Sequence, residues 1–419
     1  MSVRIAKLAN GLRVASDRMA QVETVSVGLY VGAGTRHEPA ALNGVAHMLE
    51  HMAFKGTARR DAKAIAEEIE NVGGFMNAHT GREQTAYYIK CLKEDIDLAL
   101  DILADIFLNS VFDPSEFERE RGVILQELGQ VEDTPDDVIF DRFQETAFAG
   151  QALGRPVLGT ADIIRKLPRQ AALDWRRAIY APGNAVLAAA GNLDPAYLEK
   201  RAGELFGAWH QNGQALNEVA RYTGGEFRED SDLEQAHLVL GFPGVGFADP
   251  DYWAVQVLGT LLGGGMSSRL FQEIREKRGL CYSISAHASS FADGGVFDVY
   301  TGTGEDEMAE LIPALIDQLR LARLAPAQSE VRRAKAQMRA GLLMSLESTN
   351  ARMDALGANL LIFGRDMTPE EVSAKVEAVT ADDMARVAKR ILSGTPTLAA
   401  LGPLGKLDGL DKIAATIAA

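Results

Sequence analysis

Hydrophobic positions recur along the chain with two different periods, which predict strands in some segments and helices in others. The first residues, MSVRIAKLANGLRVASD, predict two short strands around a turn at Asn10 and Gly11. Further strands are predicted at 24–31, 75–79, 84–91 and 184–192. Helices are predicted at 45–54, at 61–74, through most of 93–148, and at 195–209. The first half of the chain therefore mixes both types of element.

The second half repeats the order of elements found in the first half. Residues 26–51 predict a strand, a Gly-rich loop and a helix, and residues 236–264 predict the same series. The intervening segment, HQNGQALNEVARYTGGEFRED, is polar and lacks a clear period. We therefore expect two homologous α+β domains, at 1–210 and 230–419, joined by an interdomain linker at 211–229.

Composition and charge narrow the possible functions. The chain has 419 residues, of which 47% are hydrophobic and 24% charged, as in ordinary globular proteins. No segment has the roughly 20 consecutive apolar residues of a membrane helix, and the N-terminus lacks a signal-peptide pattern. We therefore expect a bacterial cytoplasmic protein; the alternatives are a protein of the mitochondrial matrix or of the periplasm that has already been processed. The net charge of −15 argues against nucleic acid as a partner.

The segment HMLEHMAFKGT, at 47–57, contains the strongest chemical pattern. His47 and His51 are four residues apart, so on a helix they differ by about 40° and project from one face. Two such imidazoles can bind one zinc ion, and Glu50 lies where a carboxylate can activate water. H-x-x-E-H is the inverted zinc motif. The alternative is a helix whose histidines are merely solvated or packed, because a catalytic zinc site also needs a third protein ligand.

A candidate for the third ligand lies in DPSEFERERGVILQELGQVED, at 113–133. Helical spacing places Glu120 and Glu127 about 20° apart, on the border of an apolar stripe. Such carboxylates face inward, toward a possible metal. A solvated row of charges is the alternative, and spacing alone leaves the choice open for Glu127.

These motifs, together with GGFMNAHTGREQTAYY and REKRGLCYSIS, resemble those of the pitrilysin/insulinase family of zinc metallopeptidases, the inverzincins. The similarity extends over essentially the whole chain. Within the family it is greatest to the β-subunit of mitochondrial processing peptidase and its bacterial homologues. Their fold implies two similar α+β domains, each a mainly antiparallel sheet with helices packed on one face, forming half of a clam-shaped chamber.

The resemblance assigns roles to five residues of the first half. It implies that His47, His51 and Glu127 bind one zinc ion per chain. It further implies that Glu50 is the general base and that Glu120 supports a ligand or the base.

The resemblance also implies a substrate site. An extended peptide would bind the segment FMNAHTG through the side chain of Asn77 and the backbone of Ala78. Arg275 and Tyr282 of the second half would stabilise the oxyanion. A substrate arginine would be held by an acidic pair, Asp137 and Asp141.

The resemblance implies an assembly as well. Chains of this length pair in the family, so we expect a homodimer or a heterodimer with a related subunit that encloses unfolded peptides. One alternative is a non-catalytic binding or structural subunit of the same family. Another is a metal-binding protein that does not hydrolyse peptides, for which Glu50 would have no purpose.

Overall fold

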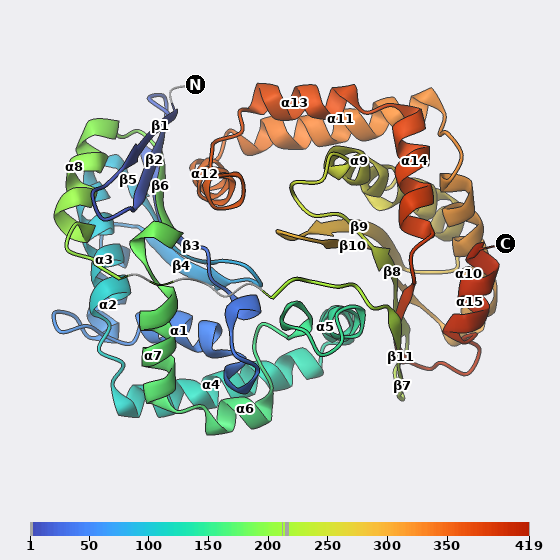
Figure 1. The fold of residues 1–419 in the computed structure, drawn as a ribbon, viewed down its shortest axis with the longest axis horizontal. Coiled ribbons are helices and arrows are strands. Elements are labelled where there is room, and N and C mark those ends of the chain that lie inside the picture. The colour runs from blue at the N-terminus through green and yellow to red at the C-terminus, as the bar shows by residue number, and fades with distance from the viewer. Residues whose placement is uncertain (1–2, 212, 214–217, 419) are drawn as a thin grey trace. The chain divides into compact units, whose positions relative to one another are not determined.

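The chain forms two compact units, each of which takes segments from both halves of the sequence. A computed structural model describes residues 3–211, 213 and 218–418 (Figure 1). The first unit consists of residues 1–129, 155–218 and 344–367, and the second of residues 130–154, 219–343 and 368–419. The continuous domain boundaries expected from the sequence therefore remain a prediction.

The expected linker at 211–229 is only partly described, since residues 212 and 214–217 lie outside the described residues. Its C-terminal end differs from the prediction. Gly225–Asp230 form strand β7, which pairs in parallel with β11 (Thr397–Gly402). A strand whose outward positions are charged lacks the hydrophobic alternation that would have revealed it.

The first unit contains a six-stranded sheet in the order β1-β2-β6-β3-β5-β4. Neighbouring strands are antiparallel, except that β2 and β6 run parallel. The strands are Val3–Lys7 (β1), Arg13–Arg18 (β2), Thr24–Val31 (β3), Phe75–Thr80 (β4), Thr85–Leu92 (β5) and Ala185–Gly191 (β6). Strand β4 lies at one end of this order, so one of its edges is an edge of the sheet.

Helices from the first half of the sequence share one hydrophobic core with this sheet. They are Val45–Ala53 (α1), Ala62–Glu70 (α2), Ile96–Asn109 (α3), Pro114–Glu132 (α4), Ala161–Lys166 (α6), Arg169–Ile179 (α7) and Pro195–Phe206 (α8). The other face of the sheet packs against α12 (Thr349–Phe363), which comes from the second half (Figure 1). Gly357 allows the close approach, because a Cβ there would lie 2.5 Å from the ring of Tyr30.

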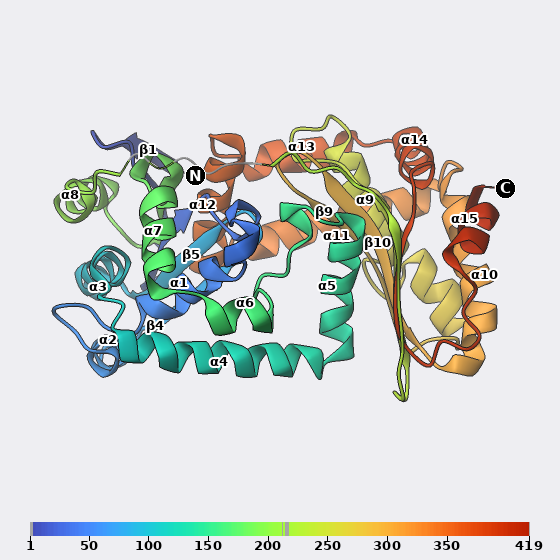
Figure 2. The ribbon, with the colours of Figure 1, turned by 60° about the horizontal axis from the view of Figure 1, so that its bottom comes forward.

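The second unit contains a five-stranded sheet in the order β7-β11-β8-β10-β9. Its remaining strands are Ala236–Pro243 (β8), Ser283–Ser290 (β9) and Gly295–Thr303 (β10). Its helices are Tyr252–Gly263 (α9), Glu305–Ala322 (α10), Gln328–Ser345 (α11), Pro369–Ala378 (α13), Ala381–Leu392 (α14) and Leu410–Ala418 (α15). Helix α5 (Pro135–Ala147), from the first half, packs on β8 and β11 (Figure 2).

The predicted fold class, two similar α+β domains with mainly antiparallel sheets, is confirmed. The structure adds that two helices pack on the sheet of the other half of the sequence. Helix α12, from the second half, packs on the first sheet, and α5, from the first half, packs on the second sheet. Helices therefore contact both faces of each sheet, rather than one face as the resemblance implied. Among the described residues, no helix is both long and apolar enough to cross a bilayer.

Candidate metal centre

Helix α1 presents the three polar residues of its motif on the side away from its apolar face. Val45, Ala46, Met48, Leu49, Met52 and Ala53 are buried in the core, as the helical spacing predicts. His47, Glu50 and His51 are partly exposed. The rings of His47 and His51 lie with their centroids 4.6 Å apart. The short helix therefore holds both imidazoles one turn apart on the same side.

Helix α4 brings Glu127 to the two histidines. Its Oε2 lies 3.7 Å from Nε2 of His47 and 3.5 Å from Nε2 of His51. If one ligand atom is taken from each of the three residues, the three atoms all lie within 4.8 Å of one another. These N–O separations exceed ordinary hydrogen bonds, but they approach the roughly 3.3 Å expected between tetrahedral ligands about 2.0 Å from a zinc ion.

The donor chemistry of this group also fits zinc. Two imidazole nitrogens and one carboxylate oxygen form the three-ligand set of a catalytic zinc site, which leaves one position open. Burial and the neighbouring His51 lower the pKa of His47 to about 4, so the imidazole is neutral at pH 7, as a metal ligand must be. The cluster can therefore hold the metal that the motif predicts.

Glu120 lies behind His51 and is almost completely buried. Its Oε2 accepts from Nδ1 of His51 at 2.9 Å, and its Oε1 is 2.8 Å from the ammonium of Lys55. With the proton of His51 on Nδ1, the lone pair of Nε2 faces Glu127. The sequence pattern had picked out Glu120 but not Lys55, which lies four residues after the second histidine, just beyond the end of α1.

Glu50 lies beside the same cluster. The hydroxyl of Thr80, at the end of β4, donates to its Oε2 at 2.5 Å. Burial raises the pKa of Glu50 above its ordinary value, whereas the bond from Thr80 and the charge of His51 act in the opposite direction. A carboxyl with a raised pKa is a better proton acceptor in catalysis near neutral pH. Sequence reasoning missed Thr80, which gave no signal beyond its place at a strand end.

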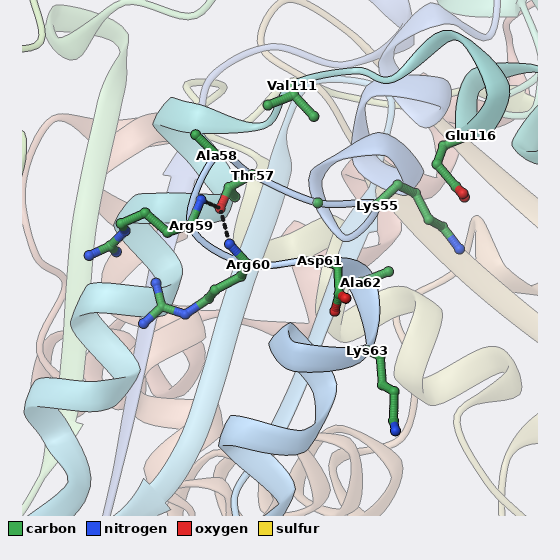
Figure 3. A pocket seen from close by; sticks show the side chains of 11 residues that line it. Lys55, Thr57, Ala58, Arg59, Arg60, Asp61, Ala62, Lys63, Val111 and Glu116 are labelled. Atoms are coloured by element: carbon green, nitrogen blue, oxygen red, sulfur yellow. Dashed lines mark hydrogen bonds between the residues drawn. The ribbon is translucent and has the colours of Figure 1, made fainter.

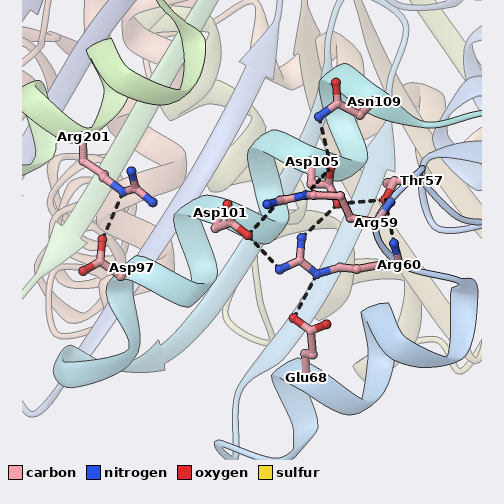
Figure 4. Close-up of polar contacts among 9 residues, drawn as sticks. All are labelled: Thr57, Arg59, Arg60, Glu68, Asp97, Asp101, Asp105, Asn109 and Arg201. Carbon is pink, nitrogen blue, oxygen red and sulfur yellow. Dashed lines mark hydrogen bonds and ion pairs between the residues drawn. The ribbon is translucent and has the colours of Figure 1, made fainter.

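The loop that follows α1 is fixed by buried polar contacts (Figure 4). The hydroxyl of Thr57 donates to Asp105 of α3 at 2.8 Å and accepts from the backbone N–H of Arg60 at 3.0 Å. The guanidinium of Arg60 bonds Asp101 and Asp105 at 2.7 and 2.9 Å. These contacts hold the loop after the second histidine against α3. A pocket of about 480 Å³ opens beside this loop and is lined in part by Lys55 (Figure 3).

Asn77 and Ala78, the predicted substrate-binding residues, lie on β4. Within the described chain β4 pairs with β5 alone, so its other edge has no strand partner. The side chain of Asn77 is exposed and accepts from the backbone N–H of Ala78 at 2.8 Å. Both residues therefore lie where an added strand would pair.

The other four predicted site residues belong to the second unit. The guanidinium of Arg275 lies 5.2 Å from the centroid of the Tyr282 ring, and the Tyr282 residue is 74% exposed. Asp137 and Asp141 lie one turn apart on α5, with Asp137 exposed and Asp141 partly buried. The structure thus forms the Arg275–Tyr282 pair, while the roles of all four residues remain predictions.

Comparison with known proteins identifies two family domains in the chain. Residues 13–161 match Insulinase (Peptidase family M16), and residues 166–338 match the Peptidase M16 inactive domain. An uncharacterized zinc protease of Rickettsia bellii is 39% identical over 95% of this chain and 97% of its own length. The β-subunit of the mitochondrial-processing peptidase of Lentinula edodes is 36% identical over 97% of this chain and 90% of its own length.

Solved structures show the same fold at lower identity. A chain of complex III2 from Candida albicans has a TM-score of 0.90 at 21% identity, over 99% of this chain and all of its own length. A protease from Helicobacter pylori has a TM-score of 0.88 at 23% identity, over 96% of this chain and 99% of its own length. Both domain matches and the sequence relatives thus agree with the motifs: the chain belongs to the insulinase family of peptidases, M16.

Proposed function

We propose that the chain is a zinc-dependent endopeptidase that hydrolyses peptide bonds in unfolded peptides or presequence-like segments. One observation carries the proposal: His47, His51 and Glu127 converge within 4.8 Å, and Glu50 lies on α1, the helix that carries both histidines. The zinc proteases among its relatives support the reaction class, and the mitochondrial-processing peptidase supports the presequence-like substrate.

In this proposal His47, His51 and Glu127 hold the metal. When bound, zinc polarises the scissile carbonyl and lowers the pKa of the attacking water. Glu50 takes the proton from that water and passes it to the leaving amine. Thr80 orients the carboxylate of Glu50 through its 2.5 Å bond. Glu120, held by Lys55, fixes the ring of His51.

The substrate is proposed to add a strand to the free edge of β4. Main-chain hydrogen bonds would then bind extended peptides with little regard to their side chains, which excludes folded segments. Arg275 and Tyr282 are suitable donors to the oxyanion. The carboxylates of Asp137 and Asp141 are suitable acceptors for the guanidinium of a substrate arginine. The net charge of −15 favours basic peptides. The chain is further proposed to work as a dimer, with itself or with a related subunit, around an enclosed chamber.

A second candidate function is that of a non-catalytic binding or structural subunit. It is considered because one of the structurally similar proteins is a chain of complex III2. The two candidate functions differ in the role of Glu50, because a peptidase needs this general base and a structural subunit does not. Cleavage of a quenched fluorescent basic peptide by the zinc-loaded chain, alone and with candidate partners, distinguishes them. We expect the wild type to cleave the peptide, and we expect the cleavage rate of Glu50→Gln to be lower by about 100-fold or more.

A matched control for that assay is Glu118→Gln, which changes an exposed carboxylate of α4 that pairs with Arg121, three residues along the same helix. This variant is expected to cleave like the wild type. If the zinc-loaded wild type cleaves no peptide under any of these conditions, the enzyme is the wrong candidate. If Glu50→Gln cleaves as fast as the wild type, Glu50 is not the base.

A further inference from the structure

The N-terminus of α1, the helix of the proposed metal site, is bound by the carboxyl group of Glu38, which lies six residues before Gly44. Glu38 is 3% exposed, and its Oε1 accepts from the backbone N–H of Ala46 at 2.7 Å. Its Oε2 accepts from the backbone N–H of Gly44 at 2.8 Å and from the side-chain amide of Asn43 at 2.9 Å. Ala46 directly precedes His47, so these bonds act on the first turn of α1, where the first ligand is located.

Gly44 explains why the capping group comes from elsewhere. A helix ordinarily begins with a Ser, Thr, Asp or Asn whose side chain accepts from the first turn. At the start of α1 that position is Gly44, with a φ of +94°, which L side chains rarely adopt. A Cβ there would also lie 2.7 Å from the carbonyl oxygen of Leu158. Because the close packing around Gly44 leaves no room for a side chain, Glu38 supplies the acceptor.

Glu38 is itself fixed by its surroundings. The guanidinium of Arg155 donates to the backbone carbonyl of Glu38 at 2.6 Å. The amide of Asn43 also donates to the carbonyl of Pro156 at 3.0 Å. Glu38 is therefore held at its backbone by Arg155 and at its carboxyl group by Asn43, and it can in turn fix the start of α1 relative to residues 155–156.

We propose that Glu38 is a positioning residue of the metal centre, which sets the place of α1 so that His47, Glu50 and His51 meet Glu127. The inference rests on the proposed zinc site. A helix of nine residues is too short to be stable by itself, so its position depends on packing and on bonds at its ends. At its other end, the hydroxyl of Ser110 donates to the carbonyl of Met52 at 2.8 Å. Glu38 is the ionisable group among these end contacts.

The test measures zinc affinity by competition with a chelator, together with amide hydrogen exchange over 44–53, in Glu38→Ala and Glu38→Gln. The control is Asp194→Ala, which removes the cap of α8 at Ala196 and leaves α1 untouched. We expect zinc to bind about 10-fold to 100-fold more weakly in Glu38→Ala, the range for groups that orient metal ligands. Glu38→Gln fills the same volume and keeps one carbonyl acceptor, so we expect a smaller loss, with faster exchange at the amides of Gly44 and Ala46.

If the role of Glu38 were purely structural, both Glu38 variants would behave like the Asp194→Ala control. Their stability would be lower and their zinc affinity unchanged. Zinc affinity within twofold of the wild type in both Glu38 variants would overturn the inference. If Glu38→Ala does not fold, Glu38→Gln decides alone. A wild type that binds no zinc would instead contradict the proposed function, so the two failures are distinguishable.

Discussion

The contact between Lys55 and Glu120 gives a prediction whose size follows from burial. The side chain of Glu120 is only 3% exposed. Its carboxylate lies 2.8 Å from the ammonium of Lys55 and 2.9 Å from Nδ1 of His51. The substitution Lys55→Met keeps the apolar stem and removes the charge. A hydrogen bond between charged groups contributes about 1.5–3 kcal/mol, and the partly exposed ammonium places this pair at about 2 kcal/mol.

The loss should be seen in two measurements. Urea unfolding of the metal-free variant should show a free energy of unfolding about 2 kcal/mol below that of the wild type. Zinc affinity should fall about tenfold, because Glu120 without Lys55 no longer orients His51.

Lys63→Met provides the matched control for this substitution. The side chain of Lys63 is 79% exposed and pairs with Glu67 at 3.3 Å, so its removal should change stability by less than about 0.5 kcal/mol. If the two lysine variants behave alike in both measurements, the role assigned to Lys55 is refuted.

Three further predictions concern the site and the fold. Glu127→Gln should lower the zinc content of the purified protein, measured by atomic absorption; unchanged zinc would remove Glu127 from the ligands. Burial raises the pKa of Glu38 to about 7, so the folded protein holds the proton of this carboxyl group more tightly than the unfolded chain does. The free energy of unfolding of the wild type, relative to that of Glu38→Gln, should therefore fall by at most about 3 kcal/mol between pH 4.5 and 7. Above about pH 7 this difference should stay level. A pH-independent difference in urea midpoint would contradict this. Gly357→Ala should destabilise the fold by about 1–3 kcal/mol through its contact with Tyr30. Gly341→Ala, which meets no described atom within 4 Å, should not lower the melting temperature, and equal melting of the two variants would argue against the close packing of α12.

The sequence predicted those parts of the fold that depend on local spacing. The apolar positions of α1 and the strand pair β4–β5 follow from periods that neighbouring residues determine. The pairing of α12 with the first sheet does not, because an apolar face shows that a helix packs without showing which sheet it meets. Strand β7 was missed because its outward side chains, such as Glu226 and Arg228, are charged.

The candidate site divides in the same way. His47, Glu50 and His51 lie within one turn of helix, so their spacing alone placed them together. Glu127 required the resemblance, because its approach depends on how α4 packs. Glu38 gave no capping signal, since a cap is sought next to its helix and this one precedes Gly44 by six residues.

The central claim is that one zinc ion at His47, His51 and Glu127 supports peptide hydrolysis. The most direct test is to titrate zinc into the metal-free protein, with its partner if one is required, while measuring both bound metal and cleavage of a basic fluorescent peptide. We predict that cleavage rises in proportion to bound zinc and stops rising at one ion per chain, and that Glu50→Gln binds the same zinc without cleaving. Cleavage that does not depend on zinc, or stoichiometric zinc binding without cleavage by the wild type, would contradict the account.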